Sequence, residues 1–119
     1  MKTKIILIIF SLFALSYISN SQDTVSSKEA KDFIGQVKIV KGTVASVFVS
    51  NKSTVLINFD EAHPNATFVA VIKAGTSGIS YSDIKKGTIL TISGMIEDYK
   101  GKPEIILNEQ SQIIKIENP

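Results

Sequence analysis

The sequence contains no cysteine and no arginine, and these two absences exclude several classes of function. Without cysteine the chain has no disulfide, no thiolate zinc site and no cysteine nucleophile. Because all 13 of its basic residues are lysines, it also lacks the side chain that makes bidentate contacts with phosphate and guanine. The single histidine, His63, would need Asp60 or Glu61 to hold a metal ion, so we expect a polar loop there instead.

The patterns that usually mark an active site are missing as well. The sequence has no Gly-x-Ser-x-Gly elbow, no Gly-x-Gly-x-x-Gly turn and no Walker-type loop. Its acidic residues show no spacing typical of a paired acid and base. Those considered are Asp83, Glu97, Asp98 and Glu104. We therefore predict a binding protein that is not an enzyme and uses neither metal nor cofactor, with a hydrolase as the least supported alternative.

The first 21 residues have the pattern of a signal peptide. Lys2 and Lys4 form a charged start, and the apolar run that follows is too short to span a bilayer. We expect cleavage before Gln22, with an uncleaved membrane anchor as the alternative. No cysteine follows the run to carry a lipid. We predict a signal peptide over 1–21 and a single domain over 22–119, secreted or periplasmic and not stably inserted in a membrane.

Cleavage would remove the excess of positive charge. Two of the 13 basic residues, Lys2 and Lys4, lie in the predicted signal peptide, so 11 remain against 11 acidic residues. The mature chain is then formally neutral. It would lack the long-range attraction that drives sequence-independent binding to nucleic acid.

Two segments of the remaining chain repeat one pattern. Gly35–Val44 aligns with Gly87–Ile96, with two glycines seven residues apart and β-branched residues at the same offsets in each copy. A glycine inside a strand usually marks a bulge or a bend, so each copy is predicted to be a strand bent near Gly42 or Gly94. In the first copy the apolar positions also change phase between Val44 and the valines that follow, which again requires a bulge.

The rest of the chain supplies further strands around these two. After a flexible segment at 23–27, Ser26 and Glu29 have the spacing of a capping box for a short helix over 30–34, whose Phe33 and Ile34 are predicted to pack across one end of the fold. Five strands are predicted, with a short closing strand at 112–117; they cover 37–49, 54–59, 67–72, 88–97 and 104–107. The pattern predicts an all-β, five-stranded Greek-key barrel of the OB (oligonucleotide/oligosaccharide-binding) type with a short N-terminal helix, in preference to a β-sandwich.

Three motifs also carry a family resemblance. Leu56-Ile-Asn-Phe59, His63-Pro-Asn65 and the run from Gly87 to Leu107, with its Tyr-Lys-Gly-Lys-Pro-Glu-Ile, resemble small bacterial OB-fold domains of the nucleic-acid-binding type. The resemblance extends over about 30–116. It implies a barrel that binds ligands across its middle strands and adjoining loops, with His63 and Lys100 standing where relatives often have tyrosine and arginine.

The candidate ligand-binding residues are Lys52, Asn58, Tyr99, Lys100 and Lys102. Tyr99 between lysines can stack on a ring and hold an anionic group, and the loops around Lys52 and Tyr99 are those that the fold uses for ligands. We predict an exported binding module for single-stranded nucleic acid or an oligosaccharide. The alternative is a structural or accessory envelope protein that contacts a protein partner through an exposed strand edge.

Overall fold

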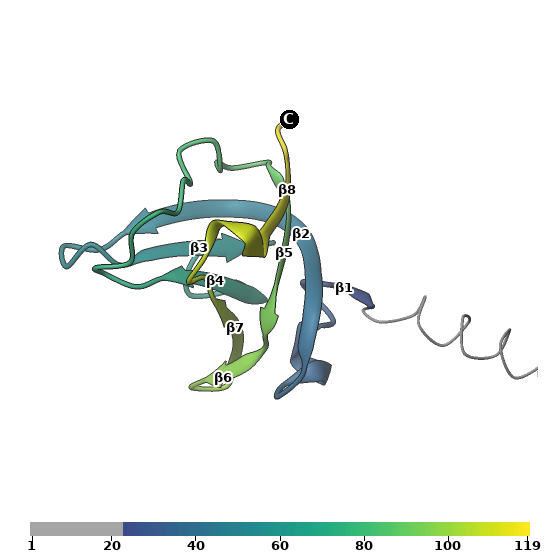
Figure 1. Ribbon diagram of the computed structural model, residues 1–119. Helices are drawn as coiled ribbons and strands as arrows, with labels where there is room; N and C mark the ends of the chain where they lie inside the picture. The colour runs from purple at the N-terminus through teal and green to yellow at the C-terminus, as the bar shows by residue number, and fades with distance from the viewer. Residues whose placement is uncertain (1–22) are drawn as a thin grey trace, which may run out of the picture.

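The computed structural model describes residues 23–119, and its regular elements are almost all β-strands (Figure 1). The eight strands are β1 (Thr24–Ser26), β2 (Val37–Val49), β3 (Val55–Phe59), β4 (Phe68–Ile72), β5 (Ile89–Met95), β6 (Glu97–Tyr99), β7 (Lys102–Ile106) and β8 (Ile113–Glu117). Two short 3-10 helices, η1 (Ala30–Phe33) and η2 (Gln110–Gln112), join them. The strands form one mixed sheet with the order β6-β7-β4-β3-β2-β5-β8, and β1 pairs with β2.

The long strand β2 is bent and pairs with strands in both halves of the sheet (Figure 1). Its first half, Val37–Thr43, pairs with β5, and its second half pairs with β3. The register to β3 shifts between Val44 and Ser46. This irregularity is the bulge that the change of phase predicts, although it follows Gly42 by two residues instead of coinciding with it.

The two copies of the repeated pattern lie side by side as antiparallel neighbours. Gly35–Val44 runs along β2 and Gly87–Ile96 along β5. Val40 pairs with Ile92, which occupies the same position in the other copy, and both side chains are fully buried. The repeat therefore describes a local two-fold arrangement centred on this pair.

The backbone hydrogen bonds at the ends of the two copies obey the same two-fold relation. The Gly35 amide donates to the Ile96 carbonyl over 2.7 Å, and the Gly87 amide donates to the Val44 carbonyl over 2.8 Å. Both glycines have positive φ, of 87° and 91°, which explains why glycine stands at the start of each copy.

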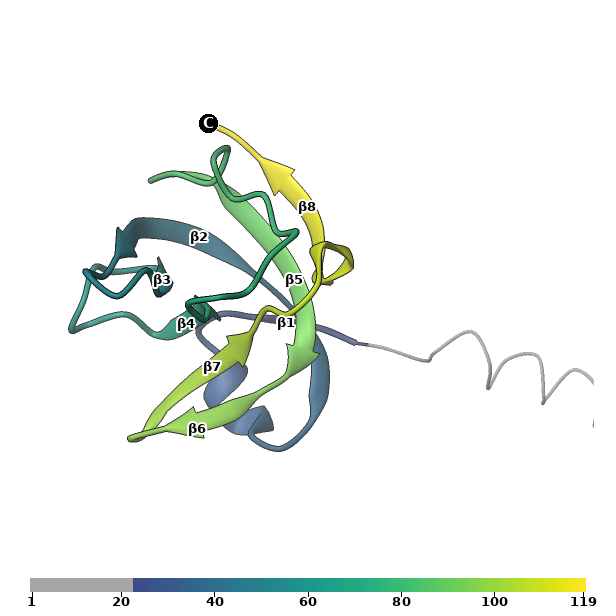
Figure 2. The ribbon, with the colours of Figure 1, turned by 60° about the vertical axis from the view of Figure 1, so that its left-hand side comes forward.

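The chain itself links the two halves of the sheet at Ile96. β5 ends at Met95 and β6 begins at Glu97, so the predicted fourth strand is divided into two strands, one pairing with β2 and the other with β7 (Figure 2). A Cβ atom on Gly94 would lie 2.7 Å from the Ile105 side chain, so the absence of a side chain there lets β5 approach β7. The result is a curved, barrel-like sheet with eight strands where five and a short closing strand are predicted.

The N-terminal part differs from its prediction in two ways. The segment expected to be flexible forms β1, which pairs in parallel with β2. The capping-box contacts are present, with the Ser26 hydroxyl 2.8 Å from the Glu29 carboxylate, but the helix that follows is a four-residue 3-10 helix. Phe33 packs against the core, whereas Ile34 is 40% exposed, because this helix is too short to present both residues to the same surface.

The core lies inside the curve of the sheet. Phe59 and Phe68 are fully buried and meet edge to face with ring centroids 5.1 Å apart. Strand β4 is buried along its whole length, which agrees with its unbroken apolar sequence. Further core residues, in strands or directly beside them, are Val25, Val40, Val44, Val55, Ile57, Leu90, Ile92, Ile96, Ile105 and Leu107.

The predicted signal peptide and its cleavage site lie outside the described residues. Between residues 23 and 119, no helix is both long and apolar enough to cross a membrane.

Candidate functional site

A groove lies on the outer face of the sheet, over strands β3, β4 and β7. Strand register places residues of the outer face in a row, in which Asn58 lies opposite Val69 and Val69 lies opposite Glu104. Because alternate residues share a face, Leu56 and Asn58 point outward while Ile57 enters the core. The floor of the groove is therefore largely apolar, with one amide and one carboxyl group set into it.

Two loops form the walls of this groove, which has a volume of about 300 Å³. The loop between β3 and β4 supplies His63 and Pro64, and the hairpin between β6 and β7 supplies Tyr99 and Lys100. The complete lining is Leu56, Asn58, His63, Pro64, Val69, Tyr99, Lys100, Lys102 and Glu104. Groups from three strands and two loops thus converge on one site.

The β6–β7 hairpin exposes the aromatic ring of Tyr99 to solvent. Its two-residue turn has φ values of 51° at Lys100 and 87° at Gly101, as a tight hairpin turn of the I′ type requires. Tyr99 is 56% exposed, and the Lys100 ammonium lies 5.3 Å from the centre of its ring. Exposed tyrosine next to lysine can stack on a planar group and attract an anion.

A hydrogen bond joins the two walls across one end of the groove. The Lys102 ammonium donates to the carbonyl oxygen of Pro64 over 2.9 Å. An ammonium group has three donors, so this bond leaves Lys102 with donors for a ligand. Lys102 and Pro64 are 38 residues apart in the sequence. Their bond therefore connects the β6–β7 hairpin to the β3–β4 loop and restrains the position of one relative to the other.

The carboxyl group of Glu104 has an altered acidity. Partial burial raises its pKa above the ordinary value, and the neighbouring Glu97 carboxylate raises it further, while Lys73 acts in the opposite direction. Glu97 lies directly opposite Glu104 in the β6–β7 ladder. The floor of the groove thus carries one carboxyl group, that of Glu104, and the same groove is lined by Lys100 and Lys102.

The structure brings four of the five candidate residues together. Asn58, Tyr99, Lys100 and Lys102 all line the groove. Asn58 forms its floor, with its side chain 2% exposed and its amide donating to the Ser46 hydroxyl over 3.1 Å. Lys52 instead lies on the turn between β2 and β3 and does not line the groove.

The sequence interpretation missed several groove residues. At His63 the sequence predicts only a polar loop, and Glu104 is only one of several acidic residues without a typical spacing. The signal for Leu56 and Glu104 is available in principle, since residues of one parity on a strand share a face. No local pattern indicates that the β3–β4 loop meets the β6–β7 hairpin, because that contact depends on parallel pairing of β4 with β7.

A second hollow extends the groove over β2. It has a volume of about 480 Å³ and shares Leu56, Asn58 and His63 with the groove. Phe48, which is 51% exposed, and Ser46 line its far side. The outer face thus offers a continuous surface from Tyr99 at one edge to Phe48 at the other, with room for a ligand longer than one ring.

Asp60 has a structural role beside this surface. Its carboxylate accepts hydrogen bonds from the hydroxyls of Ser27 and Thr67, and so connects the N-terminal segment to the β3–β4 loop. Throughout the part of the chain that the structure describes, no three histidine or acidic side chains cluster as metal ligands would.

The strand order and the curved sheet together define an OB-fold domain. The family model described as tRNA_anti-like matches residues 22–111. The chain therefore belongs to the tRNA_anti-like family.

A solved structure with a TM-score above 0.5 shows the same fold. OBody AM1L10, solved bound to hen egg-white lysozyme, is 20% identical, with a TM-score of 0.59 over 82% of this chain and 96% of that one. Asparaginyl-tRNA synthetase from Entamoeba histolytica is 15% identical, with a TM-score of 0.46, and the match covers 82% of this chain but only 23% of the synthetase. A search of curated proteins found no match.

Proposed function

We propose that this protein is a small exported OB-fold module that binds single-stranded nucleic acid in the groove on its outer sheet face. The observation that carries the proposal is the exposed ring of Tyr99, held beside Lys100 and Lys102 at the wall of an apolar groove. Bases stack on such rings without regard to sequence, and lysines contact the phosphates between them. Membership of the tRNA_anti-like family supports this choice of ligand over an oligosaccharide.

The charge balance sets the expected strength of binding. Glu104 on the floor and Glu97 and Asp98 on β6 oppose the lysines, and the chain has no arginine. We therefore expect weak binding in which stacking on Tyr99 contributes a large share. Stacking of one base on an aromatic side chain is worth about 1–3 kcal/mol.

Fluorescence anisotropy with a labelled single-stranded oligonucleotide at low salt tests the proposal. Tyr99→Ala should weaken binding by about 5- to 100-fold, the equivalent of losing one stacked base. Tyr99→Phe, which keeps the ring, should bind as the wild type does. Because Tyr99 is 56% exposed, both variants should fold normally, which circular dichroism checks. Failure of the wild type to bind even at low salt would remove nucleic acid as the ligand, since salt only weakens such contacts.

Export forms a separate part of the proposal. It is supported by the charged start and short apolar run of the first 21 residues. Expression of the full chain, followed by mass spectrometry of the protein outside the cytoplasm, should give a species that begins at Gln22. A species that retains Met1 and sediments with membranes would support the uncleaved anchor instead.

A second candidate function is contact with a protein partner, as in an accessory protein of the cell envelope. The exposed Phe48 in the second hollow favours it, since a large apolar side chain there can anchor a partner. Phe48→Ala distinguishes the two candidates. It should release a co-purifying protein if this function holds, and it should leave the affinity for a short oligonucleotide bound at Tyr99 unchanged.

A further inference from the structure

A third hollow, with a volume of about 250 Å³, lies between the β6–β7 hairpin and the segment that leads into η1. Gly101, Lys102 and Pro103 line one side, and Lys28 and Lys31 line the other. We call it the lysine hollow. η1 lies beside β7, as the position of the short helix next to the hairpin in Figure 2 shows. Three lysines from two distant parts of the sequence therefore line one cavity.

The local backbone presents Lys28 and Lys31 to the same side. They are three residues apart in a segment with 3-10 turns, where side chains at that spacing eclipse one another. The intervening Glu29 is turned away, because its carboxylate accepts bonds from the backbone amide of Ser26 over 3.2 Å and from the hydroxyl of Ser26 over 2.8 Å. Glu29 therefore does not pair with these two lysines, and the Asp60 carboxylate beside the hollow is engaged by the hydroxyls of Ser27 and Thr67.

Lys102 belongs to both the groove and the lysine hollow. Its bond to the Pro64 carbonyl holds the ammonium at the junction of the two cavities. A ligand that leaves the groove past Lys102 thus reaches Lys28 and Lys31 next. Cationic groups at successive points along one path suit a ligand with repeated negative charges better than a single small anion.

We propose that the lysine hollow binds the phosphodiester backbone of a single strand whose base is held in the groove, so that the strand crosses the β6–β7 hairpin at Lys102. This inference rests on the proposed function and deepens it. It assigns to the protein a ligand of several nucleotides, in place of a mononucleotide, and a path along which that ligand runs.

The salt dependence of binding tests the path. The wild type and the Lys28→Ala/Lys31→Ala variant are titrated with an oligonucleotide of about 12 nucleotides, within the range of site sizes of OB folds. Each lost phosphate contact lowers the slope of log affinity against log salt by about 0.7, so the double variant should lose about 1.4. Binding of a mononucleotide, which has no phosphodiester to reach the lysine hollow, should be the same in both proteins.

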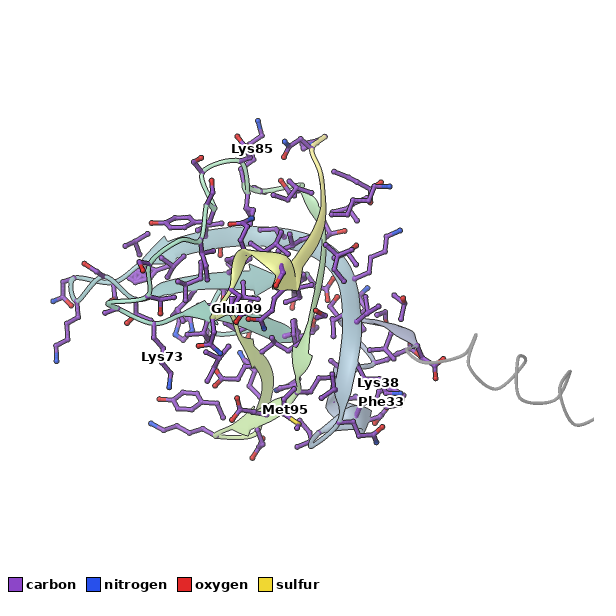
Figure 3. The ribbon with its side chains drawn as sticks, viewed as in Figure 1. Phe33, Lys38, Lys73, Lys85, Met95 and Glu109 are labelled. Carbon is purple, nitrogen blue, oxygen red and sulfur yellow. The ribbon has the colours of Figure 1, made fainter. Side chains whose placement is uncertain are left out.

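Lys85 and Lys86 provide a matched control. They carry the same charge but lie on the loop before β5, at the opposite end of the molecule from β6 in Figure 3, where Lys85 is labelled. Lys85→Ala/Lys86→Ala should leave the salt slope unchanged. All four lysines are exposed, so neither double variant should shift the urea midpoint of unfolding.

The outcomes separate this inference from the proposed function. If Tyr99→Ala weakens binding but Lys28→Ala/Lys31→Ala keeps the wild-type slope, the groove binds the ligand and the lysine hollow is only solvated surface. An equal loss of slope in both lysine variants would show attraction by overall charge, and would also overturn the proposed path. If the wild type binds no oligonucleotide, both the path and the function fail.

Discussion

Glu104 places a carboxyl group on the floor of a groove that we propose takes an anionic ligand. Its partial burial and the facing Glu97 both disfavour the charged form, so its pKa is raised. The raised pKa determines how the stability of the fold depends on pH. The folded state binds the proton more tightly than the unfolded state, so ionisation of Glu104 destabilises the fold above the raised pKa and has no effect below the ordinary value of 4.5.

The Glu104→Gln variant tests this residue. It should unfold at a higher temperature than the wild type at neutral pH, and the difference should vanish as the pH falls below the ordinary value of 4.5. It should also bind oligonucleotides more tightly at neutral pH, because a negative charge has left the groove. Thermal melts and anisotropy titrations across this pH range provide the measurement. A variant less stable than the wild type at neutral pH would contradict the argument.

Glu29 titrates with the opposite sign and must be separated from Glu104. Its bonds to Ser26 lower its pKa, so the stability it provides is present above the ordinary value of 4.5 and is lost as the pH falls. Glu29→Gln therefore serves as the control in the same pH series. Each variant is compared with the wild type, and the two differences should change with pH in opposite directions.

At the scale of elements, β2 depends on a glycine for a close approach and not for backbone freedom. Gly42 has an ordinary φ, since it is not among the positive-φ glycines. A Cβ atom there would lie 2.6 Å from the Cβ of Ser27 and 2.9 Å from the ring of Phe59. The missing side chain lets the end of β1 and the core ring of β3 both reach β2.

Gly42→Ala is therefore expected to destabilise the protein by about 1–3 kcal/mol, the usual cost of overpacking. Urea unfolding gives the value. Adding Ser27→Gly should recover part of the loss, because Ser27 makes the closest approach, and the two changes should be non-additive. A loss below about 0.5 kcal/mol for the single variant, typical of surface substitutions, would show that β1 moves aside freely.

The repeated sequence pattern corresponds to a pair of neighbouring strands. Each copy alone predicts a strand, and the pairing of Val40 with Ile92 makes the two copies neighbours in one ladder. The matching hydrogen bonds of Gly35 and Gly87 show that even the strand ends follow the two-fold relation. The similarity between the segments thus reflects similar backbone requirements at the centre of the fold.

At the scale of the whole molecule, one core inside the curved sheet supplies most of the apolar burial. Phe68 from β4 is fully buried and contacts Phe59 from β3, whereas Phe48 on the outer face is 51% exposed. Phe68 thus belongs to the core, whereas Phe48 lies on the solvent-exposed surface. Since the described chain has no disulfide, its stability depends on this packing and on the strand ladders.

Phe68→Ala should lower the free energy of unfolding by about 3–5 kcal/mol. Phe48→Ala should change it by no more than about 0.5 kcal/mol, as for a surface site. Chemical denaturation monitored by tyrosine fluorescence and circular dichroism gives both values. Comparable losses in the two variants would mean that the outer face is covered in solution, for example by a second copy of the chain.

Much of this fold could be predicted because it rests on local patterns. Alternation of apolar residues places Ile57 and Phe59 in the core, and the change of phase after Val44 predicts the bulge in β2. The strand at 24–26 was not predicted, because three residues are too few to show an alternating pattern. They form a strand only through their pairing with β2. The division of the fourth strand at Ile96 was missed for a related reason, since the change of partner from β2 to β7 is a tertiary event.

By itself the sequence determined most of the strands, the bulge in β2 and four residues of the groove, because hydrophobic alternation, glycine positions and turn residues act over short stretches of chain. Only the tertiary structure decided that His63 and Glu104 face Tyr99, that Lys52 lies elsewhere, and that Lys28 and Lys31 approach Lys102. These contacts join segments that are distant along the chain, and the parallel pairing of β4 with β7 and the curvature of the sheet bring them together.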